Sequence, residues 1–127
     1  MSTKLRDPLA TARGLGSAKD GTHHWWMQRM TAVVLALLTP WFIWFAVSQV
    51  GADQFQVRTA IASPLTASLL LSYVIALMWH ARLGLQVVVE DYVHGWKEIA
   101  LQVAIKLVYA FATVAAAIAI GRIVFTA

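Results

Sequence analysis

Residues 64–89 read PLTASLLLSYVIALMWHARLGLQVVV, and the single charged side chain among them is that of Arg82. An α-helix rises about 1.5 Å per residue, so about 20 residues are needed to cross the roughly 30 Å hydrocarbon core of a bilayer. The stretch meets this length and carries little charge. It therefore predicts a transmembrane helix.

Two further apolar runs flank this stretch. Residues 30–50 contain no charged side chain, and residues 99–125 are interrupted only by Lys106 and Arg122. The connecting segments are short and hold turn-forming and charged residues. We therefore expect an all-α integral membrane bundle, a single domain over residues 1–127. Its parts are an N-terminal segment over 1–29 and three transmembrane helices over about 30–50, 64–89 and 99–125.

The composition excludes several other classes of protein. Of the 127 residues, 60% are hydrophobic and 13% are charged, whereas a soluble domain carries about 25% charged residues. The same apolar content argues against intrinsic disorder. Cysteine is absent, so the chain itself forms no disulfide, no cysteine-ligated iron–sulfur cluster and no c-type haem attachment.

The positive charges indicate an orientation in the membrane. Lys and Arg are enriched in segments that stay in the cytoplasm, and eight of the ten in this chain fall before the first run, in the second linker or in span ends on that side. The other two, Arg58 and Arg122, lie on the opposite side. We therefore expect a cytoplasmic N-terminus and a periplasmic C-terminus. We also expect these charges to lie beside a lipid bilayer and not to bind nucleic acid.

His80 is the one histidine deep inside a predicted span. It precedes Asp91 by 11 positions, which at 100° per residue leaves both on one helix face, about 16 Å apart along the axis. Gly84 follows one turn later and removes bulk beside the imidazole. His80 could form a helix–helix hydrogen bond without a cofactor, or ligate haem iron as a neutral imidazole. In the second case the other axial ligand must come from another subunit, because the remaining histidines lie near the membrane boundaries.

Two groups at the cytoplasmic boundary also have alternative interpretations. Asp91 and Tyr92 end the second span, either as a solvated, interfacial helix end or as a carboxylate and a hydroxyl donor for a quinone carbonyl. His23 and Arg29 precede the first span. They either anchor it at the interface or bind an anion such as a haem propionate, for which the planar guanidinium is well suited.

Residues 80–95, HARLGLQVVVEDYVHG, carry a resemblance to a known family. The His, the Gly and the Asp-Tyr pair occur at the spacing found in the second span of the hydrophobic membrane-anchor subunit of succinate dehydrogenase, respiratory complex II. The entry to the first span, Arg29-Met30-Thr31-Ala32-Val33, is similar too. The resemblance covers most of the chain and is closest to bacterial relatives of the mitochondrial type.

The resemblance implies a subunit that is not catalytic by itself. It would pass electrons from succinate to ubiquinone, joining the tricarboxylic acid cycle to electron transport, in the bacterial inner membrane rather than the mitochondrial one. The implied partners are a second membrane anchor, which is a cytochrome b556-type protein, an iron–sulfur subunit and a flavoprotein. The last two hold the clusters and the FAD.

The resemblance also implies roles for single residues. His80 would ligate haem b, with the opposite ligand from the second anchor. Tyr92 and Asp91 would form part of the ubiquinone site, and Arg29 and His23 would lie near the haem propionates. Two alternatives remain: the anchor of a quinol:fumarate reductase, and a small structural or assembly membrane protein without a cofactor. A b-type absorption band in the visible spectrum would count against the second alternative only.

Overall fold

The computed structural model describes residues 18–126, of which 18–20 are described by their backbone only. These residues form the helices α2 (Ala18–Ser48), α3 (Gln54–Ala62), α4 (Pro64–Tyr92) and α5 (Trp96–Thr126). Helices α2, α4 and α5 are each long and apolar enough to cross a membrane. The predicted all-α fold with three transmembrane helices is confirmed. The N-terminal cations Lys4, Arg6 and Arg13, which enter the orientation argument, lie outside the described residues.

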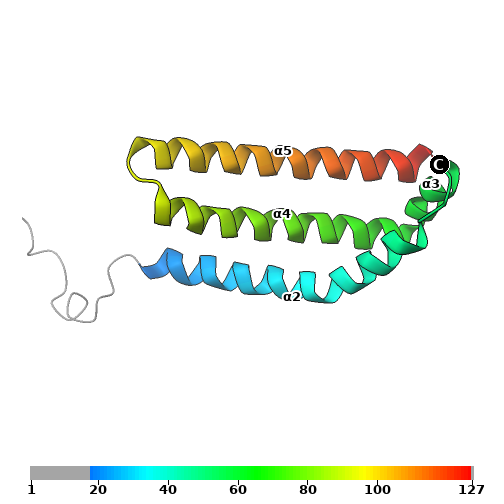
Figure 1. The fold of residues 1–127 in the computed structure, drawn as a ribbon, viewed down its shortest axis with the longest axis horizontal. Helices are drawn as coiled ribbons and strands as arrows, with labels where there is room; N and C mark the ends of the chain where they lie inside the picture. Colours follow the sequence, from blue (N-terminus) through cyan, green and yellow to red (C-terminus); the bar gives the residue numbers. More distant parts are fainter. Residues whose placement is uncertain (1–17, 127) are drawn as a thin grey trace, which may run out of the picture.

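The three long helices lie side by side as an open layer. Figure 1 shows α4 in the middle, with α2 along one side of it and α5 along the other. Helix α4 packs against both neighbours, whereas α2 and α5 make no contact with each other. The core residues are therefore concentrated on α4, where the buried side chains are Ala67, Leu70, Tyr73, Ala76, Leu83 and Val89.

Helix α2 begins well before the first predicted span. It starts at Ala18, because a helix can continue through the interfacial region, where aromatic and charged side chains are favourable. Pro40 lies inside α2, and a proline removes one backbone hydrogen bond and bends a helix. Figure 1 shows the second half of α2 turning toward α3. Beyond the proline, Phe42 stacks on Tyr73 of α4 with ring centroids 4.6 Å apart.

The linker between α2 and α4 contains a short helix that the sequence analysis does not predict. Asp53 caps α3 by accepting from the backbone N–H of Gln56 at 2.8 Å, and Gln56 Oε1 accepts from the backbone N–H of Asp53 at 3.1 Å. This reciprocal pair satisfies two N–H groups that a helix start leaves free. Arg58 then donates to Thr126 Oγ1 at 3.0 Å, which ties α3 to the end of α5.

A tight turn joins α4 to α5. Helix α4 ends at Tyr92, and the backbone N–H of Val93 still donates to Val89 O at 2.8 Å. Gly95 has a φ of +78°, a conformation that glycine adopts without the clash that a Cβ would cause. The turn brings the end of α4 and the start of α5 to the same end of the layer, where the predicted quinone residues lie.

Much of the apolar surface of the layer is exposed. Among the described side chains none is completely buried, and Leu37, Trp44, Phe111 and Phe125 are each more than two-thirds exposed. Soluble monomers rarely expose large contiguous apolar patches. The surface therefore requires lipid, or other membrane subunits, to cover it.

Candidate functional site

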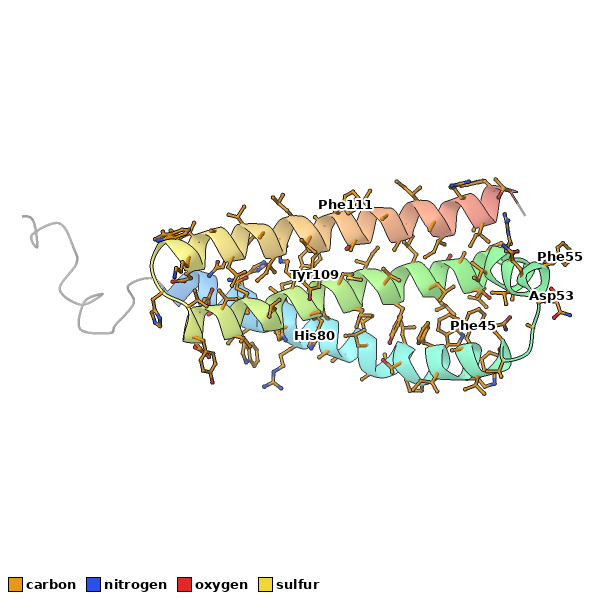
Figure 2. The ribbon with its side chains drawn as sticks, turned by 45° about the horizontal axis from the view of Figure 1, so that its top comes forward. Phe45, Asp53, Phe55, His80, Tyr109 and Phe111 are labelled. Carbon is orange, nitrogen blue, oxygen red and sulfur yellow. The ribbon has the colours of Figure 1, made fainter. Side chains whose placement is uncertain are left out.

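The described structure places His80 on the side of α4 that borders α2 (Figure 2). Its Nδ1 lies 3.1 Å from Thr31 Oγ1, and Thr31 is 8% exposed, the only buried polar residue among those whose burial is described. The Thr31 hydroxyl donates its proton to backbone carbonyls one turn earlier, Met27 O at 2.8 Å and Gln28 O at 3.1 Å. Its oxygen is then left to accept from His80.

This arrangement favours one tautomer of the His80 ring. Because the single hydroxyl proton of Thr31 is used on the backbone, the contact to Nδ1 is an N–H donation from His80 to Thr31. The proton of the neutral ring therefore sits on Nδ1, and Nε2 carries a lone pair. A histidine that ligates a metal is commonly oriented by such a hydrogen bond from its other nitrogen.

Gln28 occupies the space beside that lone pair. Its Nε2 lies 3.5 Å from His80 Nε2, and a Cβ placed on Gly84 would lie 3.7 Å from the same amide nitrogen. Gln28 Oε1 is buried and has no hydrogen-bond partner. A methyl group at Gly84 would only touch the Gln28 amide, whereas a larger side chain would compete with it for the space that a ligand at Nε2 must also enter.

The structure distinguishes between the two neighbouring histidines of α2. His23 is exposed, whereas His24 is half-buried and its Nε2 is buried without a hydrogen-bond partner. His24 precedes Gln28 by four residues and Thr31 by seven, so the three share one face of α2. The propionate role was predicted for His23 and not for His24, although the spacing of His24 relative to Thr31 was visible in the sequence.

Arg29 lies on a different face of α2. It is exposed, and its guanidinium carbon is 5.2 Å from the centroid of the Trp25 ring. In a helix it is rotated by about 200° from Thr31. The described contacts therefore do not bring Arg29 and His80 together within this chain.

Asp91 and Tyr92 lie at the end of α4, as predicted. Both are exposed, Tyr92 to 81%, and neither side chain makes a hydrogen bond within the part of the chain that the structure describes. At 1.5 Å per residue they are about 16 to 18 Å from His80 along the helix axis. The structure thus separates two sites: the His80 site between α2 and α4, and an open polar end at the α4–α5 turn.

The chemistry of the His80 site restricts what it could hold. Among the side chains that the structure describes, residues 21–126, no group of three or more His, Asp or Glu could hold a metal ion. A haem iron differs from such an ion, because the porphyrin supplies four nitrogens and each protein partner supplies one axial ligand. A single oriented imidazole with a free Nε2 fits that requirement.

Comparisons with known proteins agree with this architecture. The family model described as succinate dehydrogenase/fumarate reductase transmembrane subunit matches residues 3–120. The chain is 38% identical over 93 residues to the succinate dehydrogenase hydrophobic membrane anchor subunit of Rickettsia bellii, covering 73% of this chain and 74% of that protein. It is 32% identical over 111 residues to the protein of the same name from Paracoccus denitrificans, covering 87% and 85%. The chain therefore belongs to the family of succinate dehydrogenase/fumarate reductase transmembrane subunits.

Proposed function

We propose that this chain is the membrane-anchor subunit of a succinate:ubiquinone oxidoreductase, and that it provides one axial ligand to a haem b shared with a second anchor protein. The observation that carries the proposal is the geometry of His80. Its ring is oriented by Thr31 so that Nε2 is free of a proton, the state in which an imidazole ligates iron. The relatives named as succinate dehydrogenase anchors support the complex in which this ligation takes place.

Each residue around the haem has a distinct task in this proposal. When bound, the haem supplies a one-electron redox centre within the membrane. His80 Nε2 holds the iron, and Thr31 keeps the proton on Nδ1. Arg29 and His23 would neutralise the propionates.

Asp91 and Tyr92 form one wall of the ubiquinone site. Reduction of a quinone places negative charge on its carbonyl oxygens, and a hydroxyl donor aimed at such an oxygen stabilises that charge. Tyr92 supplies the hydroxyl, and Asp91 organises the polar surroundings. Both are exposed in this chain alone, which leaves their side chains accessible to the quinone and to the iron–sulfur protein.

The proposed complex contains four kinds of subunit in the bacterial inner membrane. The exposed apolar side chains of α2 and α5 contact lipid and the second, cytochrome b556-type anchor, which brings the opposite axial ligand. The iron–sulfur protein and the flavoprotein with its FAD bind on the cytoplasmic side, at the α4–α5 turn. The anchor completes the path of electrons from succinate to quinone.

Co-purification tests the proposal. A tag on this chain should isolate three further subunits together with a flavin, iron–sulfur clusters and haem in a pyridine haemochrome assay. A complex with all four subunits but no haem would refute the role of His80. Isolation of the chain without flavoprotein and iron–sulfur partners would refute the oxidoreductase itself.

A further inference from the structure

Six polar residues form a seam between α4 and α5 at the end that holds the α4–α5 turn. They occur at four-residue spacing on each helix: Arg82, Gln86 and Glu90 on α4, and Glu98, Gln102 and Lys106 on α5. The two helices are antiparallel neighbours. Arg82, Gln86, Gln102 and Lys106 line the same space between them, and Glu90 and Glu98 follow toward the turn. The seam therefore has a cationic pair at its inner end, an amide pair in the middle and an acidic pair at its outer end.

Hydrogen bonds connect the outer half of the seam. Gln86 Nε2 donates to Glu90 Oε1 at 2.8 Å, and Gln102 Nε2 lies 3.5 Å from the same oxygen across the helix boundary. Gln102 Nε2 is also 3.3 Å from Glu98 Oε1. The two amides direct their donors to the carboxylates, so the acidic pair is held at the outer end of the seam.

The two cations at the inner end lack a counter-charge. Arg82 Nε is buried without a hydrogen-bond partner, and the guanidinium carbon lies 5.9 Å from the Trp79 ring centroid. Neither Arg82 nor Lys106 has an ion pair with a described residue. Each stands ten residues, or about 15 Å, inside the end of its helix, and an unpaired charge at that depth is costly. An anion from outside the chain would remove this cost.

An apolar groove continues from the cations toward the middle of the layer. It has a volume of about 360 Å³ and is lined by Arg82 at one end and by Ile75, Met78, Trp79, Ala110 and Val114 among others. Arg82 is about 200° round α4 from His80. A molecule in this groove is therefore separated from His80 by the body of α4.

We propose that the seam and the groove together bind one phospholipid whose headgroup carries a phosphate and a primary ammonium, as in phosphatidylethanolamine. Along such a lipid the order is acyl chain, phosphate, short linker and ammonium. Along the protein it is apolar groove, two cations, two amides and two carboxylates. Arg82 and Lys106 bind the phosphate with charge-assisted hydrogen bonds, and one acyl chain lies in the groove.

The acidic pair provides selectivity among headgroups. Glu90 and Glu98 accept N–H donors from a primary ammonium, whereas the trimethylammonium of phosphatidylcholine has no N–H to donate. The uncharged glycerol of phosphatidylglycerol brings no cation to the two carboxylates. The seam therefore prefers phosphatidylethanolamine to both other lipids.

Lipid exchange on the assembled complex tests this proposal. The complex, purified through a tag on this chain and stripped of lipid, is incubated with micelles that contain equal amounts of phosphatidylethanolamine, phosphatidylcholine and phosphatidylglycerol. Bound lipids are then counted by native mass spectrometry, and the subunits and haem are measured separately. We expect one tightly held phosphatidylethanolamine. The double variant Arg82→Gln/Lys106→Gln should reduce its occupancy by about tenfold or more, the factor that one lost charge-assisted hydrogen bond corresponds to.

Two further variants distinguish the parts of the seam. Glu90→Gln/Glu98→Gln should still hold a phospholipid but should lose the preference for phosphatidylethanolamine. The control Arg122→Gln removes an exposed cation at the other end of α5 and should behave as the wild type. The proposal is overturned if the wild type takes up the three lipids equally, if the cation variant keeps its phosphatidylethanolamine, or if the control loses as much. It is also overturned if the cation variant instead loses the second anchor protein, which would identify a protein carboxylate as the counter-charge.

Discussion

Replacing Thr31 by valine tests whether the His80 ring is oriented for ligation. The substitution keeps the shape of the side chain and removes the oxygen that lies 3.1 Å from His80 Nδ1. The ring then has no acceptor for its Nδ1 proton at this position, and the tautomer with the proton on Nε2 becomes accessible. That tautomer cannot ligate iron until the proton leaves.

The size of the effect follows from the burial of the contact. Leaving a buried donor without an acceptor costs about 1–3 kcal/mol, and loss of a hydrogen bond that orients a metal ligand lowers metal affinity by about 10–100-fold. We therefore expect Thr31→Val to reduce haem affinity by about 10–100-fold while the subunits still assemble. The measurement is haem per complex, by pyridine haemochrome, in cells grown with limiting and with excess haem precursor.

A matched control is available on α5. Thr113 donates to the carbonyl of Tyr109 at 2.7 Å, the same backbone contact that Thr31 makes with Met27, but it contacts no histidine. Thr113→Val should therefore keep the haem content of the wild type. If Thr31→Val holds haem as tightly as Thr113→Val, the orientation of His80 by Thr31 has no role in ligation and the reasoning is refuted.

Three further predictions concern the quinone site, the orientation and the helix packing. Tyr92→Phe should lower quinone reduction by about 100-fold or more while succinate oxidation with an artificial acceptor stays near normal; equal losses in both assays would instead indicate misassembly. A reporter fused to the C-terminus should behave as periplasmic and one inserted in residues 93–98 as cytoplasmic, and reversed signals would overturn the orientation. Gly84→Ala should keep its haem, because a Cβ there meets only an ordinary contact at 3.7 Å. Gly84→Leu should lower haem content, because the larger side chain would fill the space that Gln28 occupies and that a ligand at Nε2 needs. Equal haem in both variants would contradict this packing.

The apolar runs were enough to predict the three long helices, because crossing a bilayer requires about 20 apolar residues whatever the packing. The same criterion overlooked α3, which is too short and polar to span a membrane, although its capping pair Asp53 and Gln56 is visible at the spacing of a helix start. The length of α2 before Met30 was also missed, since hydropathy detects the membrane core and not the helix that extends beyond it.

The site was only partly accessible from sequence. The spacing of His80 and Asp91 fixes their common face on one helix, because both belong to α4. The pairing of His80 with Thr31 and Gln28 depends on how α2 lies against α4, which no spacing within a single helix determines. For the same reason the pairing of Arg82 with Lys106 across the α4–α5 boundary became visible only in the structure.

The visible spectrum of the complex that carries His80→Ala tests whether His80 ligates haem iron. The variant and the wild type are purified through the same tag, with equal amounts of every subunit as the condition for comparison. We predict a b-type absorption band in the wild type and its loss or strong reduction in the variant, because the substitution removes the imidazole nitrogen that ligates the iron. A normal bis-imidazole haem spectrum in His80→Ala would contradict the account.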